Sequence, residues 1–226
     1  MPFRINSSEE FERLLEGIAD DLVHAKIHFR LHQDLSKSIK EYEREFNESR
    51  TFWFLTFRAQ YDACVFRLCR AYDQNDSALH LNNWLKIISR NIKLFEVDEF
   101  RTRLKDNTFV ESLAVNVKKP NIEQLKKDIK ATSNKNSLVK KLTILRNNIF
   151  AHRNAKLTMD NRNILEERPI KTGEIEKLLD QGIEILNRYS KLFKALSYST
   201  QIVGHDDYKY VLEAIKKDIK RFETRS

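Results

Sequence analysis

Hydrophobic side chains recur every three or four positions along most of the chain, which is the spacing of one face of an α-helix. A first helix is predicted to begin near Ser8, because Ser7 and Glu10 have the spacing of a capping box. Its pattern weakens between His32 and Ser36, where we predict a bend or a break, and then returns. The apolar positions of this helix are Phe11, Leu15, Ile18, Leu22, Ala25 and Phe29.

Residues 50–72 form the most apolar stretch, and their apolar side chains lie on too many sides for a surface helix. We therefore predict a central helix there, followed by a polar turn at residues 73–77. Residues 106–120 and the polar stretch before Gly173 are the least periodic. Further helices are predicted over residues 81–94, 97–105, 121–133, 138–153, 175–196 and 206–223.

Glycine and proline are too scarce for a fold with many strands and turns, since the chain holds only four Gly and three Pro. No internal repeat is present. The sequence predicts an all-α fold, an antiparallel helical bundle with additional C-terminal helices. We expect one domain over residues 1–226, with its core in residues 8–200 and a C-terminal helix at 206–223.

Cellular location and redox state are also predicted from composition. No apolar run approaches the roughly 20 residues that span a bilayer, and the first residues contain no signal-peptide segment, so a cytoplasmic protein without membrane contact is expected. Cys64 and Cys69 are five positions apart in an apolar segment, a spacing that favours reduced, buried thiols over a disulfide or a zinc site.

The positive charge is concentrated in one segment. Residues 118–156 contain eleven Lys or Arg and two acidic residues, a local net charge of +9 against +8 for the whole chain. The rest of the chain is therefore close to neutral. A local basic segment favours an anionic partner such as nucleic acid, although a solvated basic face is the alternative.

Within this segment, residues 138–153 carry the candidate chemistry. Arg146 and His152 are six residues apart, and His152 follows the apolar stripe of the predicted helix, so a histidine at the edge of the core is an alternative interpretation. Histidine can exchange a proton with the 2′-OH or the 5′-oxygen of RNA near neutral pH. Arginine stays charged and can stabilise a pentacovalent phosphorane. This chemistry needs no metal and no cofactor.

The local order Leu-Arg-Asn, three residues, Ala-His from Leu145 to His152 resembles the HEPN superfamily. A long N-terminal helix followed by an aromatic helix that ends at Asp73 resembles its abortive-infection branch more narrowly, over residues 8–200. The resemblance implies a metal-independent endoribonuclease, a toxin or an abortive-infection effector. It implies that Arg146 and His152 are catalytic and that the polar Asn147 assists them.

Six residues along an ideal helix separate two side chains by about 9 Å of rise and roughly 120° of rotation. Arg146 and His152 therefore reach one phosphate only if the helix distorts between Asn148 and His152, or if two copies of the motif meet across a two-fold axis. HEPN ribonucleases are generally dimers with such a cleft. We expect a homodimer whose residues 146–153 line a basic groove.

Other residues are assigned to RNA contacts or to support of the site. The candidates for contacts to the RNA backbone are Lys140, Lys141, Arg153 and Lys156. Arg70 and Asp73 are secondary candidates; Asp73 could orient an arginine or the histidine, while capping or an internal ion pair is the alternative.

Two alternative functions remain at this stage. One is a non-catalytic HEPN module that binds RNA or a protein, and the other is a structural helical protein. Some HEPN toxins are silenced by modification of a tyrosine two residues after the histidine, where this chain has Asn154. An antitoxin, if there is one, is thus expected to act by binding.

A histidine stripe gives a competing metal hypothesis. His24, His28 and His32 follow one another at four-residue spacing, which is compatible with a zinc site on a helix face. A solvated or interface strip is the alternative, because no cysteine or glutamate ligand lies close by in the sequence.

Overall fold

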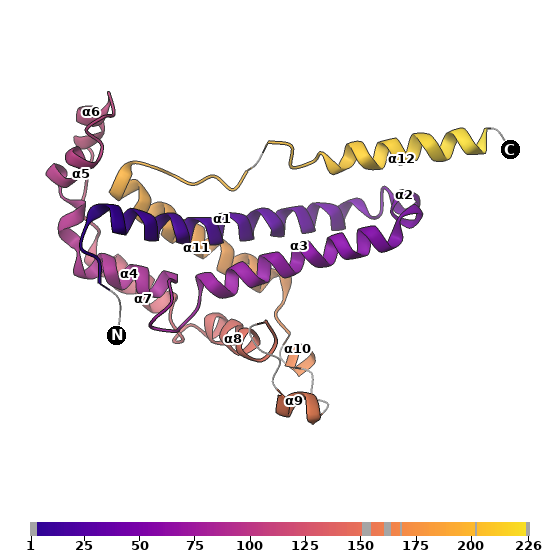
Figure 1. The fold of residues 1–226 in the computed structure, drawn as a ribbon, viewed down its shortest axis with the longest axis horizontal. Coiled ribbons are helices and arrows are strands. Elements are labelled where there is room, and N and C mark those ends of the chain that lie inside the picture. The colour runs from indigo at the N-terminus through magenta and orange to yellow at the C-terminus, as the bar shows by residue number, and fades with distance from the viewer. Residues whose placement is uncertain (1–3, 151–154, 161–163, 168, 202, 225–226) are drawn as a thin grey trace. The chain divides into compact units, whose positions relative to one another are not determined.

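The chain is helical along its length in the computed structural model, which describes residues 4–150, 155–160, 164–167, 169–201 and 203–224 (Figure 1). No strand is found in these residues, so the predicted all-α helical bundle is confirmed. The elements are α1 (Ser8–Ser38), α2 (Glu43–Glu48), α3 (Arg50–Ala71), α4 (Leu81–Arg90), the 3₁₀-helix η1 (Ile92–Phe95), α5 (Val97–Arg103), α6 (Val110–Ala114), α7 (Ile122–Ala131), α8 (Ser137–Leu145), the π-helical η2 (Arg146–Phe150), α9 (Ala155–Met159), α10 (Ile164–Glu167), α11 (Thr172–Lys194) and α12 (Tyr208–Glu223).

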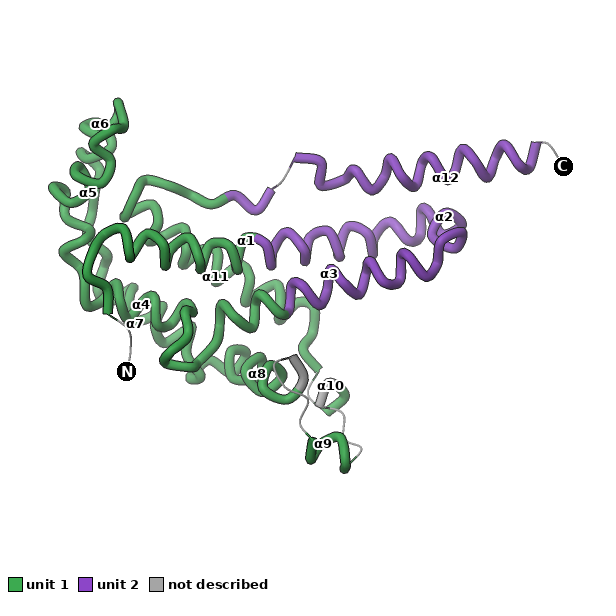
Figure 2. Tube along the Cα trace, in the orientation of Figure 1, with its two compact units in different colours: residues 1–23, 66–198 green, residues 24–65, 199–226 purple. Residues whose placement is uncertain are grey.

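The helices group into two compact units, which are coloured separately in Figure 2. The first unit comprises residues 1–23 and 66–198, and the second comprises residues 24–65 and 199–226. Both α1 and α3 contribute residues to each unit. The expectation of one domain over the whole chain stays a prediction.

An aromatic cluster forms the core of the first unit. The Phe11 ring on α1 has its centroid 4.6 Å from that of Phe193 on α11 and 5.9 Å from that of Trp84 on α4. All three rings are buried. Large aromatic side chains supply much of the apolar area that a small core removes from water. These contacts fix α4 and α11 against the start of α1.

Buried polar groups connect α7 to the same core. Asp128 on α7 accepts a hydrogen bond from the Tyr189 hydroxyl at 2.7 Å and forms an ion pair with Arg188, both on α11. The Asn82 side chain on α4 donates to the Ile129 carbonyl on α7 at 2.6 Å. Because an unpaired buried polar group is costly, these partners restrict how α4, α7 and α11 can pack together.

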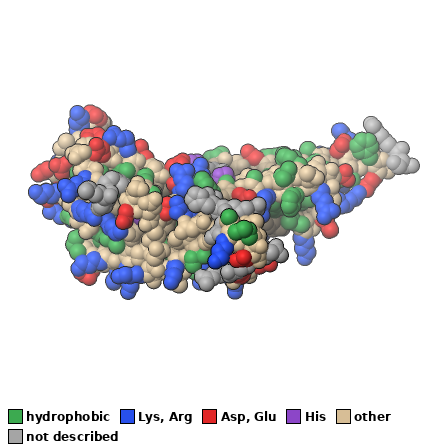
Figure 3. All heavy atoms as spheres, turned by 60° about the horizontal axis from the view of Figure 1, so that its bottom comes forward, with side chains coloured by type: hydrophobic (Ala, Val, Ile, Leu, Met, Phe, Trp, Pro, Cys, Tyr) green, Lys and Arg blue, Asp and Glu red, His purple; other side chains and the backbone are tan. Residues whose placement is uncertain are grey.

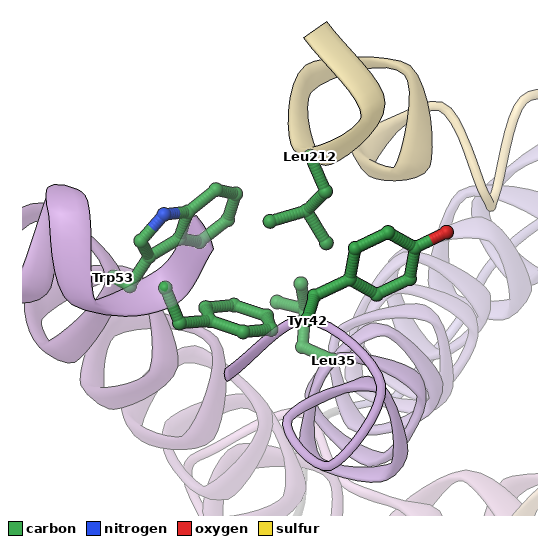
Figure 4. Close-up of a cluster of buried hydrophobic side chains, with 5 residues drawn as sticks. Leu35, Tyr42, Trp53 and Leu212 are labelled. Atoms are coloured by element: carbon green, nitrogen blue, oxygen red, sulfur yellow. The ribbon is translucent and has the colours of Figure 1, made fainter. Parts of the chain in front are cut away.

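In the second unit, α12 packs through one buried leucine. Leu212 projects into a cluster formed by Leu35, Tyr42, Phe46 and Trp53 (Figure 4). Polar contacts flank this cluster: the Tyr42 hydroxyl donates to Glu213 at 2.8 Å, and the hydroxyls of Ser38 and Tyr208 are 2.9 Å apart. The C-terminal helix is thereby attached to α1 and α2.

Of the predicted bend or break at residues 32–36, a break is wrong, because α1 continues to Ser38. The polar residues of this interval fit within a helix: Ser36 donates its hydroxyl to the His32 carbonyl at 2.7 Å, one turn earlier. Leu35 is buried beside them. The weak apolar pattern therefore reflects polar side chains on a continuous helix.

The prediction of a central helix over residues 50–72 fits the second half of α3 better than the first. Cys64 and Leu68 are buried there, and both cysteines are free thiols, as predicted. Burial raises the pKa of Cys64 to about 12, which keeps the thiol protonated. In the first half, Trp53 faces the cluster around Leu212, whereas Phe52, Phe54 and Leu55 are exposed.

Truncation of Leu212 tests the attachment of α12. Leu212 is fully buried, so Leu212→Ala removes apolar contacts and leaves a cavity, and we expect a loss of about 2 to 5 kcal/mol of local stability. Its neighbour Val211 is 50% exposed, and Val211→Ala should change stability by less than about 0.5 kcal/mol. Hydrogen exchange of residues 208–223 would measure both. Equal protection in the two variants would contradict this packing.

Candidate functional site

The sequence motif lies where α8 changes its geometry. Val139, Leu142 and Leu145 are buried and anchor α8, and the chain then forms the π-helical turn η2 from Arg146 to Phe150. Single π-helical turns are rare and are found frequently at functional sites. This turn overlaps the interval from Asn148 to His152, in which a distortion was one of the two alternatives, and the rest of that interval lies outside the described residues.

An ion pair holds Arg146. Its Nη2 lies 2.8 Å from Oδ2 of Asp73, which follows α3 in the turn of residues 73–77. The Asp73 side chain is 9% exposed and the Arg146 side chain is 30% exposed. The structure therefore brings together the predicted catalytic Arg146 and the secondary candidate Asp73, which are 73 positions apart in the sequence. The buried carboxylate orients a guanidinium that solvent still reaches.

The turn that carries Asp73 is fixed by many hydrogen bonds. Oδ1 of Asp73 accepts the backbone N–H of Gln74 at 2.7 Å and that of Asn75 at 3.2 Å. The Asn83 side chain on α4 donates to the carbonyls of Asp76 and Ala78, each at 3.1 Å. Because both oxygens of Asp73 have partners, the carboxylate is held in one orientation.

His80 supports this turn and was not identified in the sequence. It is buried at the N-cap of α4, where its Nδ1 accepts the backbone N–H of Asn83 and its Nε2 lies 3.1 Å from the Asn75 carbonyl. Nε2 therefore carries the proton. Burial lowers the pKa of His80 to about 4, while the nearby Asp73 acts in the opposite direction. Histidine is not among the preferred N-cap residues, so its role could not be predicted from its position in the sequence.

The asparagines after Arg146 help to shape the π-helical turn. Oδ1 of Asn147 accepts a hydrogen bond from Nη1 of Arg146 at 3.0 Å. Nδ2 of Asn148 donates to the Ile144 carbonyl at 2.7 Å. The predicted assisting residue Asn147 thus contacts the guanidinium directly, and Asn148, which was not predicted, binds a backbone carbonyl at the start of the turn.

The predicted residues His152 and Arg153 lie outside the described residues. Lys140 on α8 and Lys156 on α9 are exposed. Lys141 is instead bound to Glu174 at the start of α11, with 2.6 Å between Nζ and Oε2. This ion pair connects α8 to α11, and it offsets the positive charge of Lys141, which was predicted to contact RNA.

Arg70 does not share the partner of Arg146. Its Nε lies 3.3 Å from Oδ2 of Asp21 on α1, and Arg67 pairs with Asp20 at 2.8 Å. These pairs connect the end of α3 to α1. The predicted supporting residues are therefore divided: Asp73 contacts Arg146, whereas Arg70 contributes to helix packing.

The histidine stripe of α1 faces α3. Nδ1 of His28 is 2.6 Å from the Gln60 side-chain oxygen, and Nδ1 of His32 is 3.3 Å from the Phe57 carbonyl. No cluster of His, Cys, Asp or Glu suited to a metal ion occurs in the described part of the chain. The interface alternative accounts for these contacts.

A hollow of about 910 Å³ in the second unit contains none of the predicted site residues. It lies between α1 and the segment that leads into α12, and both Arg30 and Asp34 line it. Arg30 donates to the Thr200 carbonyl at 3.0 Å across one side of the hollow. Within the described ranges, no helix has the length and apolar character needed to cross a bilayer.

The arrangement around Arg146 suits recognition of an anion. A guanidinium has five N–H donors, and the contacts to Asp73 and Asn147 account for two of them. Arginine remains protonated at physiological pH, so a phosphate group can bind to it without any change in protonation.

Comparison with known proteins gives one family. Residues 8–217 match HEPN_AbiU2, described as AbiU2. The match covers most of the chain and extends into α12, beyond the range over which the motif resemblance was recognised. No curated protein and no solved structure matches the sequence.

The buried neutral state of His80 predicts a pH dependence of stability. The unfolded chain binds a proton at this residue below its ordinary pKa of 6.5, whereas the folded chain does so only near pH 4. The contribution of neutral His80 to the free energy of unfolding is therefore fully present above pH 6.5. It is lost as the pH falls toward 4, by at most about 1.4 kcal/mol per pH unit. Thermal melting at several pH values would measure this slope.

His80→Asn provides the control, because asparagine keeps an N-cap acceptor but does not titrate. The variant should show a shallower loss of stability in the same pH window. Identical slopes for the variant and the wild type would mean that the neutral His80 contributes nothing to the pH dependence.

Proposed function

The chain belongs to the HEPN_AbiU2 family, the abortive-infection type of HEPN domain, and from this premise we propose that it is a metal-independent endoribonuclease that acts as a toxin or abortive-infection effector. The HEPN family is commonly a ribonuclease. The observation that carries the proposal is the ion pair between Arg146 and the buried Asp73. It holds a partly exposed guanidinium in one orientation inside the basic segment.

In the proposed reaction, the 2′-oxygen of RNA attacks the adjacent phosphorus. The new O2′–P bond forms as the P–O5′ bond breaks, which leaves a 2′,3′-cyclic phosphate and a 5′-hydroxyl. His152 removes the 2′-OH proton or donates a proton to the leaving 5′-oxygen. Arg146 stabilises the additional negative charge of the phosphorane, and Asn147 holds the guanidinium from the other side.

Asp73 acts as a positioning residue in this proposal. It is buried and bound to the turn, so it reaches the substrate only through Arg146. A guanidinium aligned before the substrate arrives loses less conformational freedom in the transition state. Its carboxylate also offsets part of the positive charge, so the main contribution of the pair is orientation.

We further propose that the active form is a homodimer, in which residues 146–153 of the two copies line one groove. The partners are RNA and, where an antitoxin exists, a protein that acts by binding. Asn154 occupies the position of the modified tyrosine of some HEPN toxins, which argues against silencing by modification at this position.

A second candidate function is a non-catalytic HEPN module that binds RNA or protein. The same ion pair favours it, because a guanidinium already bound to a carboxylate can serve packing alone. The two candidates differ in one measurable respect: a binding module leaves RNA intact.

Cleavage of RNA in excess EDTA tests the proposed reaction. We expect the wild type to cleave single-stranded RNA under these conditions, because no metal participates. Arg146→Ala and His152→Ala should each lower the rate by at least about 100-fold, since each removes a group that stabilises the transition state. Analysis of the product ends should identify the 2′,3′-cyclic phosphate.

A stability control and a mixing experiment complete this test. Arg188→Ala breaks the ion pair with Asp128, so it reports loss of stability without loss of the motif. Mixing Arg146→Ala with His152→Ala protein tests the shared groove, because a mixed dimer regains one complete site. Equal activity of the wild type and both motif variants would refute the catalytic assignment. If the mixture of the two variants regains no cleavage activity, the shared groove is refuted.

Substitution of Asp73 tests its positioning role. Asp73→Asn keeps the size of the side chain but removes its charge, so we expect kcat to fall by about 10- to 100-fold with little change in KM. In an Arg146→Ala background, Asp73→Asn should have no further effect on kcat, because its contribution passes through the guanidinium. Initial rates at several substrate concentrations would separate kcat from KM.

Asp128→Asn is the matched control, since it weakens another buried ion pair of the same unit. It should lower the melting temperature while leaving kcat unchanged. Additive effects of Asp73→Asn and Arg146→Ala on kcat would show instead that Asp73 acts independently of Arg146.

A further inference from the structure

Helices α4 and α7 pack against each other, and they and η1 carry cations that the motif does not include. On α4, the side chains that are not buried are Lys86, Ser89 and Arg90, and Lys93 follows in η1. On α7, Lys126, Lys127 and Lys130 are exposed. The two helices pack against each other and are joined by the hydrogen bond from Asn82 to the Ile129 carbonyl. We call the cations at positions 86, 90, 93, 127 and 130 the α4–α7 face.

Few carboxylates neutralise this face. Lys126 pairs with Glu123 at 2.9 Å, whereas Asp128 is turned into the core toward Arg188. Among the described residues, none of the five cations of the α4–α7 face forms an ion pair. Figure 3 shows Lys and Arg side chains at the end of the first unit that holds α4 and α7, with Asp and Glu side chains interspersed among them. Five like charges, four on α4 and α7 and one in η1, attract a polyanion.

Hydrogen bonds connect this face to Arg146. Gln74, next to Asp73 in the turn, donates its side-chain amide to the Thr132 carbonyl at 3.1 Å. Thr132 is the C-cap of α7 and comes two residues after Lys130. The C-terminal end of α7 is thus bound to the turn that carries Asp73, and exposed Lys140 lies on α8, the helix that leads to Arg146.

We propose that the α4–α7 face is a second RNA-binding surface, which holds the sugar-phosphate backbone beside the Arg146 site. This inference rests on the proposed function for the identity of the polyanion. Lysine and arginine side chains without ion-pair partners suit phosphate contacts that do not read sequence. The surface therefore supplies affinity for longer RNA and no base preference.

The salt dependence of RNA binding tests this surface. The probe is single-stranded 2′-O-methyl RNA, which keeps the phosphates but lacks the attacking hydroxyl. In Arg90→Gln/Lys127→Gln/Lys130→Gln, three phosphate contacts are lost, so the slope of log affinity against log salt should become shallower by about 2. Fluorescence anisotropy over a range of salt concentrations gives this slope.

Matched variants separate the surface from net charge and from folding. Lys209→Gln/Lys217→Gln/Lys220→Gln removes the same charge from exposed positions of α12, and its slope should equal that of the wild type. Arg90→Lys/Lys127→Arg/Lys130→Arg keeps the charge and should keep the slope. Melting curves of all variants check folding.

Several outcomes would overturn the proposal. Equal slopes for the α4–α7 and α12 triple variants would do so, as would failure of the wild type to bind the probe. Binding to anionic phospholipid vesicles without binding to RNA would assign the face to a lipid surface instead. If the wild type cleaves RNA but the α4–α7 variant keeps its slope, the second surface alone is wrong. If the slope changes but no RNA is cleaved, the endoribonuclease proposal alone is wrong.

Discussion

The ion pair between Arg146 and Asp73 is the contact on which the candidate site depends. A carboxylate as buried as Asp73 is costly unless hydrogen bonds and an opposite charge compensate it. Two backbone N–H groups of its own turn and the guanidinium provide that compensation. Because the Asp73 carboxylate needs these partners, its ion pair with Arg146 holds the end of α8 against the end of α3.

The turn of residues 73–77 links this pair to the rest of the first unit. His80 and Asn83 attach the turn to α4, and Gln74 attaches it to the C-terminus of α7. His80 can serve in this way because burial keeps it neutral at physiological pH. A charged imidazolium at the same place would need an acceptor at Nδ1, which already accepts the Asn83 N–H. The turn that carries Asp73 is therefore held by backbone groups, amide groups and an imidazole that stays neutral at physiological pH.

Sequence periodicity predicted most of the fold because the buried faces of the helices repeat at a fixed spacing. It was wrong where the pattern depended on partners rather than on the helix itself. The apolar side chains of Phe52 and Phe54 predicted burial, yet the neighbouring elements of the second unit cover only the Trp53 side of α3. Arg146 was found from its local motif. Its pairing with Asp73 could not be derived, because nothing in the sequence specifies which of many carboxylates meets a given arginine.

The basic segment shows why charge counted along the sequence does not identify a binding surface. Its lysines separate into two groups once the helices pack. Lys119, Lys126 and Lys141 form ion pairs with Glu96, Glu123 and Glu174, respectively, which offset part of their charge. Lys127, Lys130 and Lys140 are exposed and lie on helices that lead to Arg146. Arg90, outside the segment, joins this second group through the packing of α4 on α7. The exposed cations of this second group are the ones that attract a polyanion, and only the packing of the helices shows which residues belong to it.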